Sequence, residues 1–111
     1  MSELDAVKKL RDALDAKFAA DIVVLDLQGV TPIADYFVIA TGQNSPQLMA
    51  LQDTAEEVLT GAGLKLGHIE GQKTVKWILL DYGSVVVHLF DKESRDYYKL
   101  EHIWGDAKRI M

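Results

Sequence analysis

The stretch 70–90, EGQKTVKWILLDYGSVVVHLF, constrains the fold more than any other part of the chain. It holds two apolar runs, 75–80 and 85–90, which are rich in β-branched and aromatic residues and therefore favour strands. The four residues between them include Gly83, which readily accepts the positive φ of a tight turn. The sequence therefore predicts a β-hairpin that turns at residues 81–84.

Both faces of this hairpin are apolar. Alternate residues of a strand point to opposite faces, so one face receives Val75, Trp77 and Leu79. The other face receives Ile78 and Leu80. A monomer seldom leaves a large apolar patch exposed, and the helices expected below suffice for about one face. We expect the other face to meet a second protein chain, with the C-terminal segment folding across it as the alternative.

Helical spacing of apolar residues and three capping residues complete the pattern around the hairpin. The run 21–27 is nearly all apolar, which predicts a strand buried on both faces. The expected helices run from Ser2 to about Ala19, from Asn44 to Gly61 or Gly63, and from Asp91 to Gly105, with strands at 21–27, 35–40 and 64–69. This order predicts a single α/β (α+β) domain over residues 1–111, with a mixed five-stranded sheet and helices mainly on one face.

The charge distribution limits the classes of partner. The net charge is −5, and no Lys or Arg occurs between Lys17 and Lys65. A nucleic-acid binder needs a basic stripe to displace counterions from phosphates, so we expect no direct sequence-specific binding to nucleic acid and favour a basic protein partner. The chain has no cysteine and no apolar run long enough to cross a bilayer, so we expect no membrane association and a cytoplasmic location.

Motifs for catalysis, metals and cofactors are weak. The turn 41–47 precedes a helix but has no phosphate-binding lysine or glycine spacing, so we interpret it as a helix cap. His68, His88 and His102 lie too far apart in sequence for a helical metal pair, and His88 is expected in the core. Asp26 and Asp35 end strands and are interpreted as turn formers. We therefore predict no enzyme, no catalytic or metal site and no cofactor.

Trp77 and Tyr82 have two open interpretations. Large aromatic residues mostly serve cores, but Trp and Tyr also dominate the energetics of protein interfaces. In the second case Glu70, Lys76 and Asp81 would form a polar rim around them. The polar and aromatic residues of the last helix are interpreted as a structural clasp rather than a site; they are Arg95, Tyr98, Glu101 and Trp104.

Several segments together resemble one known family. Residues 34–42, ADYFVIATG, are similar to the signature of the ribosomal silencing factor, or iojap, family, and so are Glu70-Gly71, 77–83 and 87–90. Arg95, Tyr98 and the closing residues 100–104 also match, so the resemblance covers residues 21–107. The chain departs from the family at Asn44, near Pro46 and at Ser84, which are cap and turn positions.

The resemblance implies a nucleotidyltransferase-like fold without catalytic residues, since the Gly-Ser and Asp-x-Asp pattern of active enzymes is missing after Gly42. It also implies a homodimer that binds the large ribosomal subunit through the ribosomal protein numbered fourteen. The factor would then sterically block joining of the small subunit and repress translation when nutrients are scarce. The expected contact residues are Trp77, Leu79, Asp81, Tyr82 and Glu70. The alternative is a nucleotidyltransferase-like enzyme acting on a small nucleotide.

Overall fold

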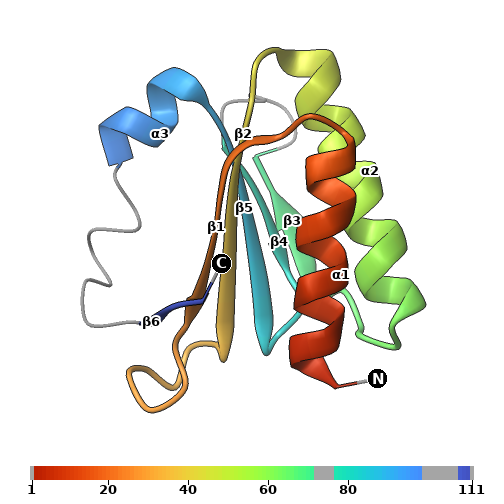
Figure 1. The fold of residues 1–111 in the computed structure, drawn as a ribbon, viewed down its shortest axis with the longest axis vertical. Coiled ribbons are helices and arrows are strands. Elements are labelled where there is room, and N and C mark those ends of the chain that lie inside the picture. Colours follow the sequence, from red (N-terminus) through yellow and green to blue (C-terminus); the bar gives the residue numbers. More distant parts are fainter. Residues whose placement is uncertain (1, 72–76, 99–107, 111) are drawn as a thin grey trace.

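A computed structural model describes residues 2–71, 77–98 and 108–110, apart from the side chains of residues 97 and 98. Helices and strands alternate along the chain as the hydrophobic patterns predict (Figure 1). The elements are α1 (Glu3–Ala16), β1 (Ala20–Asp26), β2 (Tyr36–Gly42), α2 (Ser45–Gly61), β3 (His68–Glu70), β4 (Trp77–Asp81), β5 (Val85–Asp91), α3 (Lys92–Tyr98) and β6 (Lys108–Arg109). None of the helices in the described ranges is long and apolar enough to cross a membrane.

The strands form one mixed sheet in the order β3-β4-β5-β2-β1-β6. The predicted hairpin is confirmed, because β4 and β5 are antiparallel and Gly83 in their turn has a φ of 77°. The sheet has six strands rather than the predicted five. Residues 108–109 pair with Leu25 and Asp26 at the edge of β1, a pairing that the predicted order of elements did not include. A strand of two residues is too short to show an alternating pattern and forms only because an edge is available.

The core consists of two clusters on opposite faces of the sheet. On one face α1 and α2 pack side by side, and Ile78 and Leu80 of β4 are fully buried beneath them (Figure 1). Trp77 and Leu79 pack against the cluster on the other face, as strand alternation predicts. This second cluster contains Val23, Leu25, Leu27, Ala34, Phe37, Ile39, Val86 and Phe90.

The central strands of the second face are buried within a single chain, whereas Trp77 and Leu79 of the hairpin are half-buried, so contact with a second chain stays a prediction. Ile39 and Phe90 have no exposed surface, and Phe37 is 5% exposed. The short helix α3 lies on this side, whereas α1 and α2 lie on the other (Figure 1). Arg95 of α3 donates from Nη1 to Oγ1 of Thr41 at 2.9 Å, which ties α3 to β2. Only Trp77 and Leu79 of the second cluster are half-buried.

Capping explains where the helices begin. Ser2 Oγ accepts from the Asp5 amide at 3.1 Å, Asn44 Oδ1 from the Gln47 amide at 2.9 Å, and Asp91 Oδ1 from the Ser94 amide at 2.7 Å. All three N-caps agree with the sequence. The predicted end of the last helix at Gly105 lies outside the described residues. The third predicted strand is shorter than expected and spans His68–Glu70 alone.

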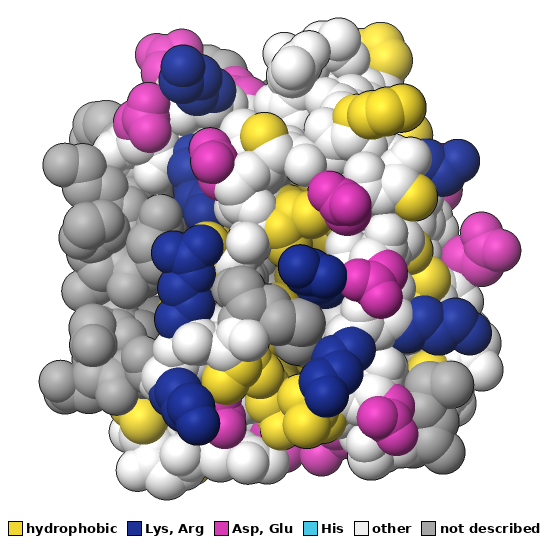
Figure 2. Space-filling model, viewed as in Figure 1, with side chains coloured by type: hydrophobic (Ala, Val, Ile, Leu, Met, Phe, Trp, Pro, Cys, Tyr) yellow, Lys and Arg dark blue, Asp and Glu magenta, His cyan; other side chains and the backbone are white. Residues whose placement is uncertain are grey.

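The first helix ends at Ala16 rather than near Ala19. The Phe18 amide donates to Asp15 O at 2.9 Å and the Ala19 amide to Leu14 O at 3.1 Å, which is the pattern of a Schellman motif. Its left-handed position is usually glycine, but here it is Phe18, with a φ of 67° and 83% exposure. Hydrophobic side chains are visible in Figure 2 at the upper right, over the region where α1 ends and α2 begins. The exposed Phe18 could not join the predicted helical stripe, because the helix has already ended.

Candidate functional site

The sheet face opposite α1 and α2 carries most of the residues that the sequence nominated as contacts. We call its part formed by Trp77, Leu79, His88, Phe90 and Phe37 the aromatic face. Paired residues of neighbouring strands point to the same face, so the register sets this group in rows across the sheet. The rows are Glu70-Leu79-His88-Ile39-Val23, Trp77-Phe90-Thr41, and His68-Asp81-Val86-Phe37-Leu25.

A hydrogen bond between two aromatic side chains organises this face. Trp77 Nε1 donates to His88 Nδ1 at 3.1 Å. His88 is 3% exposed, and burial lowers its pKa from 6.5 to about 4, so the ring is neutral near pH 7. Because Nδ1 accepts, the proton of the neutral ring lies on Nε2. His88 is therefore a hydrogen-bonded core residue, as expected from its place among valines.

Ring stacking fixes the position of the indole. The centroids of Trp77 and Phe90 are 5.0 Å apart with 28° between the planes. Phe37 meets His88 edge-on at 4.6 Å. Such pairs contribute about 0.5–1.5 kcal/mol each beyond the area that they bury. Trp77 is thus packed against Phe90 and hydrogen-bonded to His88 while remaining half-buried, so part of the residue belongs to the core, and its role in an interface stays a prediction.

Acidic side chains border the aromatic face at the edge strand. The carboxylates of Glu70 and Asp81 each approach the His68 imidazole, with N–O distances of 3.7 Å. The Glu70 and His68 side chains are 70% and 54% exposed, and that of Asp81 is 35% exposed. Asp81 Oδ1 also accepts from the Gly83 amide at 2.8 Å, which stabilises the hairpin turn. The predicted rim therefore exists for Glu70 and Asp81, whereas Lys76 lies outside the described residues.

Gly71 follows Glu70 of the rim directly and lies against the backbone of Trp77. Its φ is 86°, and a Cβ at this position would collide with the carbonyl oxygen of Trp77. No other residue type combines that conformation with such a close approach. The edge of the face at Trp77 consequently depends on a glycine directly after β3.

Tyr82 does not belong to the same surface. It is 4% exposed and packs in the cluster under α1 and α2, and its hydroxyl lies 3.0 Å from Thr60 Oγ1 of α2. The sequence placed Tyr82 beside Trp77 as a contact residue because both are large aromatics near the hairpin turn. Strand alternation puts Tyr82 on the face of Ile78 and Leu80, and its amide still donates to Val85 O at 2.9 Å across the hairpin, so its side chain holds the hairpin against α2.

Two backbone donors of the turn before α2, the amides of Gln43 and Gln47, are bonded to side chains of the turn itself. Gln47 Oε1 accepts from the Gln43 amide at 2.6 Å, while the Gln47 amide is bonded to Asn44. Gly42 serves packing, since a Cβ there would come within 2.9 Å of two atoms of Leu48. The interpretation as a helix cap rather than a phosphate cradle agrees with this geometry.

The carboxylates of Asp26 and Asp35 lie close enough to interact. Burial raises the pKa of Asp35, and the nearby charges of Glu3 and Asp26 raise it further. Asp26 Oδ1 accepts from the Gln28 amide at 3.0 Å, which is the turn-forming role that the sequence indicated. Within the described ranges, no group of three or more His, Cys, Asp or Glu residues could hold a metal ion. The most extensive side-chain arrangement on the described part of the second face is the aromatic face with its acidic border.

The contribution of His88 to this face was missed at the level of sequence. Only the strand register shows that His88 pairs with Leu79 and so sits diagonally from Trp77, two residue pairs along the ladder. A single polar residue inside a run of valines was the available signal. It indicated a buried hydrogen bond but not its partner.

Comparisons with known proteins agree on one family. The family model described as "Ribosomal silencing factor during starvation" matches residues 1–111. The ribosomal silencing factor RsfS of Bacillus subtilis is 38% identical over 107 residues, covering 96% of this chain and 91% of its own. That of Halalkalibacterium halodurans is 36% identical over 110 residues, covering 99% and 94%. A crystal structure of a Chromobacterium violaceum protein superimposes with a TM-score of 0.89 at 33% identity, covering 95% of this chain and 88% of that one.

Proposed function

The chain belongs to the ribosomal silencing factor family, and from this premise we propose that it represses translation by binding the large ribosomal subunit. A silencing factor of this family acts on the ribosome as a regulator. The finer proposal is that it binds the ribosomal protein numbered fourteen and sterically blocks joining of the small subunit. The single observation that supports a docking role most strongly is the half-buried Trp77 on a rigid, acid-bordered face.

The chemistry of the aromatic face suits a basic protein. Trp77 and Leu79 offer apolar area with little conformational freedom left to lose on binding, which favours affinity. Glu70 and Asp81 supply negative charge beside it, which attracts Lys and Arg but repels the phosphates of bare RNA. We propose these four residues as the contact surface. Tyr82 supports them from the opposite side of the sheet.

Four further properties are part of the proposal. The protein is a cytoplasmic homodimer that acts without catalysis and makes no direct sequence-specific contact with nucleic acid. The dimer rests on the family resemblance, because the apolar second face is largely buried within one chain. Light scattering at high micromolar concentration tests the dimer, and a monomer mass would refute it. Incubation with labelled nucleotides and Mg²⁺ tests the alternative enzyme, and nucleotide transfer would favour that alternative.

Sedimentation of ribosomal subunits tests the contact surface. Wild-type protein should co-sediment with large subunits in a sucrose gradient and reduce the peak of joined ribosomes when small subunits are added. Leu79→Asp should abolish both effects, because a charge is introduced into the apolar part of the face. Met49→Asp is the matched control, since Met49 is 38% exposed on α2, on the other side of the sheet. Equal loss in both variants, or equal retention, would exclude the aromatic face as the docking surface.

The acidic rim has a separate kinetic test. Glu70→Gln with Asp81→Asn removes two charges while the Asn amide oxygen can still accept from the Gly83 amide. Association with large subunits should slow, and the rate should become less sensitive to salt, because rim charges act mainly on encounter. Dissociation should change little. An association rate that ignores both the substitutions and the salt concentration would refute electrostatic steering.

A further inference from the structure

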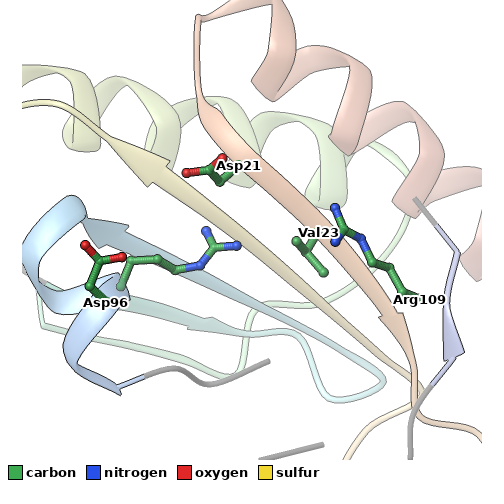
Figure 3. A pocket seen from close by; sticks show the side chains of 5 residues that line it. Asp21, Val23, Asp96 and Arg109 are labelled. Carbon is green, nitrogen blue, oxygen red and sulfur yellow. The ribbon is translucent and has the colours of Figure 1, made fainter. Parts of the chain in front are cut away.

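A polar hollow lies beside α3, β1 and β6, and the strands β5 and β2 separate β1 from β4, which carries Trp77. It has a volume of about 200 Å³ and is lined from three separate elements (Figure 3). β1 supplies Asp21 and Val23, α3 supplies Arg95 and Asp96, and β6 supplies Arg109. The proposed silencing function uses none of these five residues.

The hollow lies near a branch point of the sheet. β2 and β5 are neighbouring parallel strands with Thr41 paired to Phe90 and Gly42 to Asp91 at their carboxyl ends. From there the chain enters α2 on one face after β2, and α3 on the other face after β5 (Figure 1). Crevices at such switch points, outside the carboxyl ends of parallel strands, are where open α/β sheets bind ligands. Arg95 reaches this branch from α3, since it donates to Thr41.

The side chains around the hollow carry balanced charge. Two guanidinium groups and two carboxylates line it, with Val23 as an apolar wall. Arg95 is 6% exposed, and a guanidinium has five N–H donors, so it can serve the protein and a ligand together. A purely anionic ligand would have to approach both aspartates, and a purely cationic one both arginines. A ligand with one group of each sign meets an opposite charge at both ends.

The backbone conformation of Asp21 is a further feature of the hollow. Asp21 has a φ of 48° although it is not glycine, and it stands where β1 and β2 fall out of register. This bulge directs the start of β1 toward the hollow that the Asp21 carboxylate lines (Figure 3). Bulges often re-aim a side chain next to a binding site. The backbone thus adopts an unfavourable conformation at a residue whose charge the hollow requires.

The volume of the hollow limits which ligands it can hold. Pockets that enclose drug-sized molecules measure about 300–1,000 Å³. At about 200 Å³ the hollow is smaller than these, with the volume of roughly seven liquid water molecules. It therefore suits a molecule of a few heavy atoms rather than a nucleotide.

We propose that this hollow, lined by Asp21, Arg95, Asp96 and Arg109, binds a small zwitterion of the free amino acid class. The arginines take the carboxylate of the ligand and the aspartates take its ammonium group. Arg–carboxylate pairs are frequently bidentate, which orients the ligand. The proposal is independent of ribosome binding, because the hollow shares no residue with the proposed contact surface and needs no partner.

Two-dimensional ¹H–¹⁵N NMR on the whole chain tests the site. Titration with single amino acids at millimolar concentration should shift the amides of Asp21, Val23 and Asp96 in a saturable way. The matched probes are the corresponding amine without the carboxylate, the corresponding acid without the ammonium group, and inorganic phosphate. These three should bind at least tenfold more weakly than the best amino acid. Phosphate binding as tight as that of the amino acid would replace the zwitterion site by an anion site and refute the proposal.

Substitutions give the second readout. Asp21→Asn keeps a residue type that tolerates positive φ and removes only the charge. Arg109→Gln and Asp96→Asn remove the charges of two exposed residues. Each should weaken the amino acid at least fivefold with an unchanged melting temperature, while Met49→Asp should leave the titration unaltered. No saturable shift with any of the standard amino acids, or shifts that survive all three substitutions, would overturn the assignment.

Discussion

Replacing Trp77 by Phe separates the part of this residue that holds the fold from the part that could meet a partner. The variant keeps an aromatic ring over Phe90, so most of the stacking is retained. It removes the indole N–H and leaves Nδ1 of His88 without the donor that now lies 3.1 Å away. His88 is 3% exposed, so water cannot readily take the place of that donor.

The expected loss of stability follows from His88 Nδ1, the buried acceptor that loses its donor. Leaving a buried polar group unpaired costs about 1–3 kcal/mol, so Trp77→Phe should lose about 2 kcal/mol of stability. For a domain of this size that corresponds to a fall in melting temperature of roughly 8 °C. Trp77→Ala should lose more, because stacking and apolar burial disappear as well.

A double-mutant cycle with His88→Leu is the decisive assay. When both polar partners are replaced by apolar groups, no buried donor or acceptor remains unpaired. The combined loss of stability in urea unfolding should therefore be at least about 1 kcal/mol smaller than the sum of the single losses. Large-subunit binding gives a second measurement. Per folded molecule, Trp77→Phe should weaken it less than about tenfold, and Trp77→Ala by roughly 30- to 1000-fold.

Additivity in the cycle would show that the Trp77–His88 bond contributes no stability and would refute this reasoning. A Trp77→Ala protein that is fully folded at the assay temperature and still binds large subunits normally would return Trp77 to a purely structural role.

Three other results are expected. The pKa of His88 is depressed to about 4 when folded, against 6.5 when unfolded, so the unfolded state takes up the proton first as the pH falls. The contribution of neutral His88 to the free energy of unfolding is fully present above pH 6.5, and about 2 kcal/mol of it should be lost between pH 7 and 4.5 in urea titrations. His88→Leu should remove this part of the pH dependence of stability. Gly71→Ala should lower the free energy of unfolding by about 2 kcal/mol or more, and the melting temperature with it, because its φ of 86° and the Trp77 carbonyl both exclude a Cβ. A melting temperature within error of wild type would contradict this. Phe18→Gly should raise stability by about 1 kcal/mol in the same assay, because the Schellman position has a φ of 67° and the ring is exposed; loss of stability would mean that the ring packs in solution.

Much of the fold could be predicted from local pattern. The hairpin, its glycine turn and the three helix caps depend on neighbours in sequence, and the structure has them at the expected residues. The placement of Ile78 and Leu80 opposite Trp77 and Leu79 follows from strand alternation alone. The sequence likewise carried enough of the family signature for the resemblance, which the matching family model confirms.

Contacts between distant segments could not be predicted in this way. Two residues at 108–109 become a strand only because β1 offers an unpaired edge. The central strands of the second face are buried within the chain, although a count of helices suggested that it would be open. The sequence also grouped Tyr82 with Trp77, but strand alternation from Leu80 puts it on the helical side, and only the fold shows its partner there, Thr60 of α2.

The difference between the features that the sequence predicted and those that it did not has one physical cause. Periodicity, capping and turn chemistry act over a few residues, so the amino-acid sequence by itself determined the two strands of the hairpin, their two apolar faces and the helix starts. Strand register and the packing of remote segments depend on the summed burial of the whole chain. Only the tertiary structure therefore decided that His88 accepts from Trp77, and that Arg95, Asp21 and Arg109 line one hollow.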